Sequence, residues 1–90
     1  NLNRAMNEVT QEEILKLLCQ RLTGLAKADF EITAETNLIT QLAIDSIKLL
    51  NLIMEIEDNF DISVPVNALT DVITVRDLAD LIYRIKSESK

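Results

Sequence analysis

Glycine and proline are nearly absent from this chain, which has one of each, Gly24 and Pro65, in 90 residues. An all-β sandwich or barrel of several hairpins would need more glycine and proline at its turns, so the sequence disfavours that class of fold. Apolar residues make up 48% of the chain, but only three residues are aromatic. The core must therefore be aliphatic, and a chain of this length forms a single domain.

Apolar residues recur every three or four positions in three segments, which predicts three amphipathic helices. We expect these helices at about 11–24, from 45–46 to about 59, and from 74 past 85. The intervening residues 25–44 carry isolated apolar anchors among polar residues and are expected to form a long ordered loop. A short helical turn is expected at 67–71.

Two capping boxes mark helix starts. Thr10 with Glu13 opens the first helix, and Thr74 with Asp77 opens the last, each pair three residues apart. Gly24 is expected to end the first helix in a left-handed cap.

The second helix has more apolar residues than a single buried side would require. Its core side is expected to carry Leu49, Leu50, Ile53, Ile56 and Phe60. Other sides of the helix carry further apolar residues, Ile47, Leu52 and Met54. This helix is therefore either covered on several sides or partly exposed as a contact surface.

These elements predict an all-α fold, a small helical bundle of three main helices plus a short helical turn. We expect a single domain at 10–86. Residues 1–9 are expected to be a disordered or added N-terminal segment, and 87–90 a C-terminal tail.

Charge and residue types exclude several functions. Nine basic against fifteen acidic residues give a net charge of −6, which is the wrong sign for binding nucleic acid. The chain has no histidine and one cysteine, Cys19, so we expect neither a metal site nor histidine-based catalysis. No apolar run reaches the length of a membrane span, and no signal-peptide pattern opens the chain. We expect a cytoplasmic protein, and a monomer.

Ser46 lies between Asp45 and Ile47, where the long loop meets the second helix. Serine and aspartate both cap helices, so one interpretation is that either residue only accepts hydrogen bonds from first-turn amides. The tripeptide alone does not distinguish this interpretation from a functional one.

Two longer segments around Ser46 carry a family resemblance: residues 42–47, LAIDSI, and residues 56–65, IEDNFDISVP. They resemble the acyl carrier protein family. The attachment motif of that family is Asp-Ser-Leu or Asp-Ser-Ile, and its second helix closes with an acidic pair, a phenylalanine and an extended segment reaching proline. Both features occur in order and at the family's spacing, and the resemblance extends from about Glu12 to Ile85.

The resemblance implies that Ser46 carries 4′-phosphopantetheine, attached by a separate phosphopantetheinyl transferase that uses coenzyme A, with Asp45 completing the motif. The protein would then be a non-catalytic carrier of acyl thioesters. A helix N-terminus suits a phosphodiester, because its amides and dipole favour negative charge. The implied partners are an acyl-loading ligase or acyltransferase and ketosynthase-type enzymes of fatty acid or specialised, polyketide-like biosynthesis.

The chain departs from the family pattern in three places. Ala43 stands where many members have glycine, and Lys48 and Asn51 stand where carriers of fatty acid synthesis usually have acids. The negative charge of the second helix is left to Glu55, Glu57 and Asp58. Partner contacts are expected from Ile47, Lys48, Asn51, Met54, Glu57 and Asp58.

Two alternatives stay open at this point. Asp-Ser-Ile-Lys is similar to the motif of many peptidyl carrier domains, so the cargo could be aminoacyl or peptidyl. The chain could also be an unmodified helical interaction module whose second helix docks a partner and whose Ser46 is only a cap.

Overall fold

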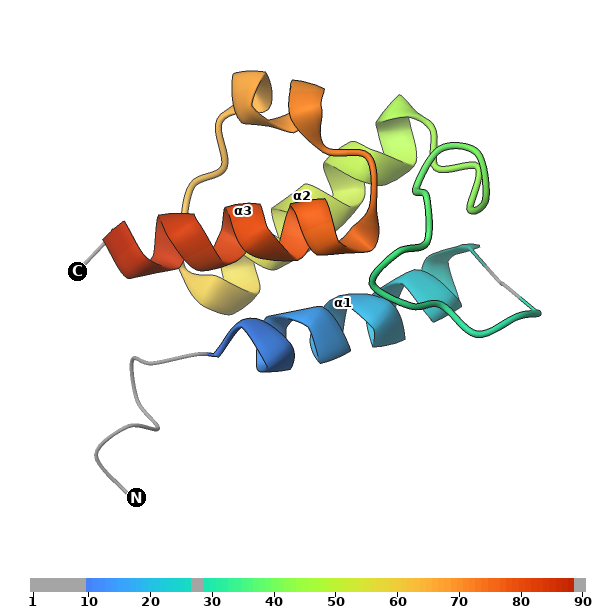
Figure 1. Ribbon diagram of the computed structural model, residues 1–90. Coiled ribbons are helices and arrows are strands. Elements are labelled where there is room, and N and C mark those ends of the chain that lie inside the picture. The colour runs from blue at the N-terminus through green and yellow to red at the C-terminus, as the bar shows by residue number, and fades with distance from the viewer. Residues whose placement is uncertain (1–9, 27–28, 89–90) are drawn as a thin grey trace.

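Three α-helices and one short 3-10 helix form the regular structure of residues 10–26 and 29–88, the part of the chain that this computed structural model describes (Figure 1). In chain order they are α1 (Gln11–Ala26), α2 (Ser46–Phe60), η2 (Val66–Asp71) and α3 (Val75–Glu88). The described residues contain no strand, and one isolated antiparallel bridge joins Asn37 to Thr74. The predicted all-α bundle with a short helical turn is confirmed.

The predicted domain limits stay predictions. The expectation for residues 1–9 lies outside the described residues, as do residues 89–90. The last helix, α3, continues through Glu88, two residues into the segment expected to be a tail.

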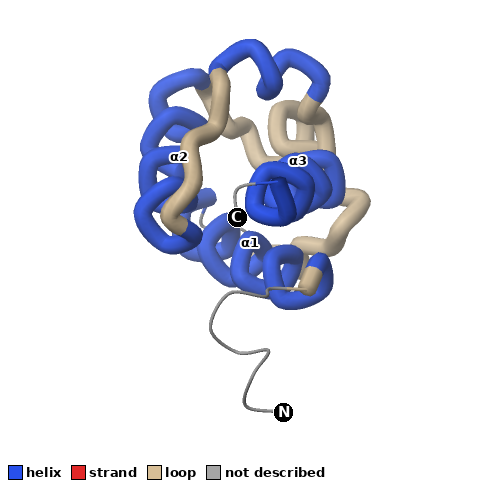
Figure 2. The backbone as a smooth tube through the Cα atoms, turned by 90° about the vertical axis from the view of Figure 1, so that its left-hand side faces the viewer, coloured by secondary structure: helices blue, strands red, loops and turns tan. Residues whose placement is uncertain are grey.

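The three main helices enclose one core, which is aliphatic apart from Phe60. Of these helices, α1 and α3 pack most closely, and Figure 2, which looks along α3, shows α1 beneath it and α2 to one side. The loop before α2 also contributes buried side chains. The most deeply buried residues are Ile14, Leu18, Leu22, Leu38, Val75, Leu78 and Ile82.

The expected left-handed cap at Gly24 is wrong. No glycine in the described chain has a positive φ, and α1 continues past Gly24 to Ala26. Leu25 and Ala26 are partly buried against the core. Packing of these two side chains extends the helix across a residue that would otherwise favour its end.

The side of α2 that faces the core is also rotated from the expectation. Ile53, Ile56 and Phe60 are buried as predicted, but Leu52 is only 2% exposed, whereas Leu50 is 48% exposed. Both leucines fit an apolar helical row, so spacing alone does not choose between them. The positions of α1 and α3 around α2 make the choice.

Both predicted capping boxes are confirmed. The Glu13 amide donates to Thr10 Oγ1 over 3.1 Å, and the Thr10 amide donates back to Glu13 Oε1 over 3.0 Å. At α3 the Asp77 amide donates to Thr74 Oγ1 over 3.2 Å, and the Thr74 amide donates to Asp77 Oδ2 over 3.0 Å. These bonds satisfy amides that have no partner within the helix.

Replacing Asp77 with alanine is expected to destabilise the fold by about 1 kcal/mol at neutral pH. Hydrogen bonds from the amides of Thr74 and Ile73 lower the pKa of the Asp77 carboxyl in the folded chain. A lowered pKa stabilises the fold fully above the unfolded carboxyl pKa, and that stabilisation is lost as the pH falls through the folded value. Urea unfolding should show a smaller difference between Asp77→Ala and wild type near pH 3 than near pH 7. The exposed Asp71 provides an Asp71→Ala control, and an equal loss at both pH values would contradict the assignment.

Candidate functional site

Ser46 is the first residue of α2 and its side chain is exposed. Asp45 is the N-cap, and its Oδ1 accepts from the Lys48 amide over 2.9 Å. The Asp45 carbonyl accepts the first intrahelical bond, from the Leu49 amide at 2.9 Å. Because Asp45 performs the capping, the Ser46 hydroxyl is not required for it.

The end of α2 at Ser46 suits a phosphodiester. In an α-helix the first amides have no partner within the helix, and here Asp45 uses the amide of Lys48. The amides of Ser46 and Ile47 remain at the helix end, together with the positive end of the helix dipole. A phosphate joined to the Ser46 oxygen would therefore lie in a favourable electrostatic environment.

The loop before Ser46 is held by hydrogen bonds to Asn37. Its Oδ1 accepts from the amides of Ile39 and Thr40, both over 2.9 Å, and its own amide donates to Gln41 Oε1 over 2.7 Å. The Ile44 amide donates to the Leu38 carbonyl over 3.0 Å. These bonds hold residues 37–44 of the predicted loop in place, whereas its first two residues, 25 and 26, belong to α1 instead.

The loop is also fastened to the start of α3. The Leu38 amide donates to the Ile73 carbonyl over 2.9 Å, and the Val75 amide donates to the Thr36 carbonyl over 3.1 Å. Thr36 is a polar residue buried in the core, and its Oγ1 accepts from the Thr33 amide over 2.9 Å. Hydrogen bonds between residues 36–38 and residues 73–75 thus hold the loop that leads to Ser46 and α2.

Ala43 adopts a left-handed backbone conformation, with φ of 54°. A Cβ atom is disfavoured there, and glycine tolerates this region without the same penalty. The structure therefore explains why glycine at this position suits the loop, and shows that alanine keeps the turn at a cost in strain.

Replacing Ala43 with glycine is expected to stabilise the fold by about 0.5 kcal/mol, because relief of the left-handed strain exceeds the added entropy of the unfolded chain. Chemical denaturation measures the difference. Ala34→Gly, at a loop residue without a positive φ, is the control and should destabilise. A loss of stability in Ala43→Gly would show that the strain is negligible.

An exposed apolar strip runs along α2 from the residue after Ser46. Ile47 is 71% exposed, Leu50 48% and Met54 62%. Their spacing places them on one side of the helix. Sequence reasoning missed Leu50, because it had placed this residue in the core. We call Ile47, Leu50 and Met54 the α2 strip.

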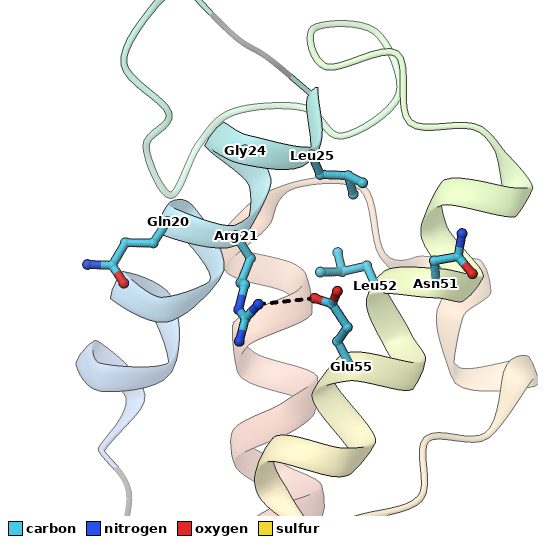
Figure 3. Close-up of a pocket in the computed structure, with 7 residues that line it drawn as sticks. All are labelled: Gln20, Arg21, Gly24, Leu25, Asn51, Leu52 and Glu55. Atoms are coloured by element: carbon cyan, nitrogen blue, oxygen red, sulfur yellow. Dashed lines mark ion pairs between the residues drawn. The ribbon is translucent and has the colours of Figure 1, made fainter.

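Two of the four charged residues of α2, Glu57 and Glu55, interact with other parts of the chain. Glu57 is half-buried, and its Oε2 accepts from the Val64 amide over 2.8 Å. Glu55 Oε1 lies 3.6 Å from Arg21 Nη1 of α1 across a groove between the two helices (Figure 3). Asp58, Lys48 and Asn51 are exposed.

Within residues 10–26 and 29–88, three or more histidine, cysteine, aspartate or glutamate side chains do not gather as a metal site requires. Burial raises the pKa of the Cys19 thiol, and the carboxylate of Glu31 raises it further. Cys19 is therefore protonated at neutral pH and a weak nucleophile. None of the described helices is both long and apolar enough to cross a membrane.

Comparison with known proteins identifies the class. Residues 13–82 match the family model described as a phosphopantetheine attachment site. A probable acyl carrier protein of Caulobacter vibrioides is 44% identical over 59 residues, which are 66% of this chain and 69% of that protein. A meromycolate extension acyl carrier protein of Mycobacterium leprae is 30% identical over 84 residues, 90% of this chain and 71% of that protein. An acyl carrier protein of Prochlorococcus marinus is 32% identical over 75 residues, 82% of this chain and 94% of that protein.

The chain belongs to the acyl carrier protein family. Its cofactor is covalently attached 4′-phosphopantetheine. Acyl carrier proteins are carriers and generally not catalysts. The family predicted by the resemblance is therefore confirmed, and the alternative of an unmodified interaction module loses its support.

Proposed function

We propose that Ser46 is the residue that carries 4′-phosphopantetheine, with Asp45 holding the helix end at which it is attached. The observation that carries this proposal is an exposed serine that follows the capping aspartate at the start of α2. Ser46 also lies within the residues matched by the family model. A helix end, where the first amides have no partner within the helix, favours the phosphodiester.

The attachment requires a separate phosphopantetheinyl transferase. The Ser46 oxygen forms a bond to the phosphorus that bears the pantetheine arm of coenzyme A, and the bond from that phosphorus to the second phosphate breaks. Adenosine bisphosphate leaves, and the serine proton passes to a base of the transferase. This division of labour is consistent with a chain that has no histidine.

The cargo we propose is an acyl group, held as a thioester on the thiol of the arm. The names of the relatives support an acyl cargo over the aminoacyl alternative. Lys48, at a position where fatty-acid carriers usually have acids, favours a specialised pathway. The partners would be an acyl-loading ligase or acyltransferase and a ketosynthase-type enzyme. The cytoplasmic location and the monomeric state stay predictions.

Partner enzymes would contact the α2 strip beside Ser46. Ile47 and Met54 were predicted contacts, and their exposure supports that role. Leu50 joins them in the proposed surface. Asp58 is exposed and supplies a steering charge, whereas Glu57 contributes less because its carboxylate also binds the Val64 amide.

Intact-mass measurement tests the proposal. The apo protein, incubated with coenzyme A and a transferase of broad specificity, should gain the mass of one phosphopantetheine arm. The holo protein isolated from its native cells should carry an additional acyl mass. An aminoacyl mass would support the peptidyl carrier alternative, and a protein that gains no arm would contradict the carrier function.

A loaded acyl chain of medium length is expected to enter the core. Ile53, Ile62 and Leu81 are buried at 5%, 8% and 5% exposure, and an aliphatic core with few rings can separate around an aliphatic guest. Methyl NMR shifts of these residues should change when the holo protein is acylated. The control is acetyl-loaded protein, which should change only near Ser46. Shifts confined to Ser46 and Ile47 with the longer chain would show that the cargo stays in solvent.

A further inference from the structure

The loop that leads to Ser46 contains a single turn of α-helical type. The Gln41 amide donates to the Asn37 carbonyl, four residues back, over 3.2 Å. The Ala43 amide donates to the Ile39 carbonyl, again four residues back, over 3.1 Å. In Figure 1 this part of the loop curls beside the start of α2. The segment is therefore a short regular turn with a beginning and an end of its own.

Asn37 begins the turn in the way that an N-cap residue begins a helix. Its Oδ1 accepts from the amides of Ile39 and Thr40, both over 2.9 Å, which are the amides that an N-cap side chain satisfies. Its own amide donates to Gln41 Oε1 over 2.7 Å, so the capping is reciprocal, as in a capping box. We call residues 37–43 the Asn37 turn.

Ala43 ends the Asn37 turn in the left-handed conformation, with φ of 54°. A left-handed residue whose amide bonds to the carbonyl four residues back is a common way to end a helix, but glycine usually occupies that position. The Cβ atom of alanine makes the conformation unfavourable. The turn thus contains one residue that opposes it, Ala43, and one whose side chain stabilises it, Asn37.

The Asn37 turn is joined to the attachment site through two residues. The Ile44 amide donates to the Leu38 carbonyl over 3.0 Å, and the Ile44 side chain is buried. Asp45 follows in an extended conformation and caps α2 directly before Ser46. Because Ala43 immediately precedes these residues, its backbone conformation sets the direction in which the chain enters α2.

The inner and outer sides of the turn are held differently. Three buried side chains fasten the inner side to the core: Leu38, Leu42 and Ile44. The outer side, which includes Thr40 and Ala43, is exposed. There the side-chain oxygen of Asn37 provides the acceptor for two amides. Loss of this oxygen should therefore open the outer side of the turn while the rest of the domain stays folded.

We propose that Asn37 is a positioning residue for attachment of the phosphopantetheine arm. Its hydrogen bonds hold Ala43 in the left-handed conformation, and the closed turn presents Asp45 and Ser46 to the transferase in one orientation. Asn37 acts through the turn and takes no part in the transfer itself. This inference rests on the proposed attachment at Ser46.

Steady-state kinetics of arm transfer test the positioning role, with coenzyme A, a transferase of broad specificity and the apo carrier as the varied substrate. Asn37→Ala should raise KM for the carrier about threefold and leave kcat unchanged, because the apparent affinity falls with the fraction of molecules in the binding-competent conformation. Asn37→Asp keeps the Oδ1 acceptor and should restore KM. Adding Ala43→Gly to Asn37→Ala should also restore it, since glycine adopts the left-handed conformation without the cap.

Thr10→Ala is the matched control, because it removes the cap of α1 at a similar cost in global stability. Its KM should equal that of wild type, since loss of global stability does not change affinity while the protein stays folded. Circular dichroism at the assay temperature checks the folded state of each variant. An unchanged KM in Asn37→Ala, an equal rise in Thr10→Ala, or no restoration by Asn37→Asp would overturn the proposal.

Hydrogen exchange of the nitrogen-15-labelled apo protein tests the turn without the transferase. Asn37→Ala should lower the protection factors of the Ala43 and Ile44 amides about fivefold, which is a loss of about 1 kcal/mol and the usual contribution of one cap. Thr10→Ala should leave them unchanged. Unchanged protection in Asn37→Ala would contradict the holding role.

Two further outcomes keep the test decisive. If Asn37→Ala does not fold, Ala43→Gly alone provides the reverse test, since relief of strain should raise the protection factor of the Ile44 amide, and an unchanged value would overturn the proposal. If the wild-type protein gains no arm, the attachment proposal at Ser46 fails. The exchange measurement on the apo protein still decides whether Asn37 holds the turn, so the two failures are distinguishable.

Discussion

Replacing Ser46 with alanine is expected to abolish attachment of the phosphopantetheine arm. The oxygen that would form the phosphodiester is removed, so incubation with coenzyme A and a transferase should leave the intact mass of the variant unchanged. The fold should remain, with a change in unfolding free energy below about 0.5 kcal/mol, because Asp45 and not Ser46 caps α2. Peptide mapping of the wild-type holo protein should find the arm on the peptide that contains Ser46.

Ser63 provides the matched control. Its side chain is exposed, but it lies in the segment after α2 and does not begin a helix, so Ser63→Ala should accept the arm as wild type does. A Ser46→Ala protein that still gains the arm would remove Ser46 from its proposed role. Circular dichroism on the same samples should show that the Ser46→Ala protein keeps its helices, so that loss of modification is not due to unfolding.

Truncation of Leu78 is expected to give the largest loss of stability. Leu78 on α3 is fully buried, and removing a buried leucine side chain to alanine costs about 3 kcal/mol through lost burial and the cavity left behind. For a domain whose total stability is on the order of 5–10 kcal/mol, this change removes a large share. Urea unfolding with a common slope for both proteins would measure it.

Leu50 provides a comparison with Leu78, because it is also a leucine and apolar spacing alone predicted that it would be buried in the core. Because Leu50 is 48% exposed, Leu50→Ala should cost less than about 1 kcal/mol. The same variant should weaken docking of a ketosynthase-type partner, since Leu50 belongs to the α2 strip. Equal losses of stability in Leu50→Ala and Leu78→Ala would contradict an orientation of α2 that leaves Leu50 exposed.

The helices and their starts could be predicted because their causes are local. The Thr10–Glu13 and Thr74–Asp77 boxes join residues three apart, and helical spacing of apolar residues needs no knowledge of neighbours. The end of α1 could not be predicted in the same way. Gly24 favours a stop, and only burial of Leu25 and Ala26 against the core carries the helix further.

Some features of the site also followed from the sequence, and others only from the tertiary structure. The sequence by itself determined the motif at Ser46, the family and the departures at Ala43 and Lys48, since these depend on residue identity and order. The tertiary structure decided that Asp45 caps the helix and that Leu50 is exposed while Leu52 is buried. It also decided that Arg21 meets Glu55 across a groove. Each of these depends on how α1, α2 and α3 are placed around one another, and such placement is set by contacts between residues far apart in the chain, which no local pattern specifies.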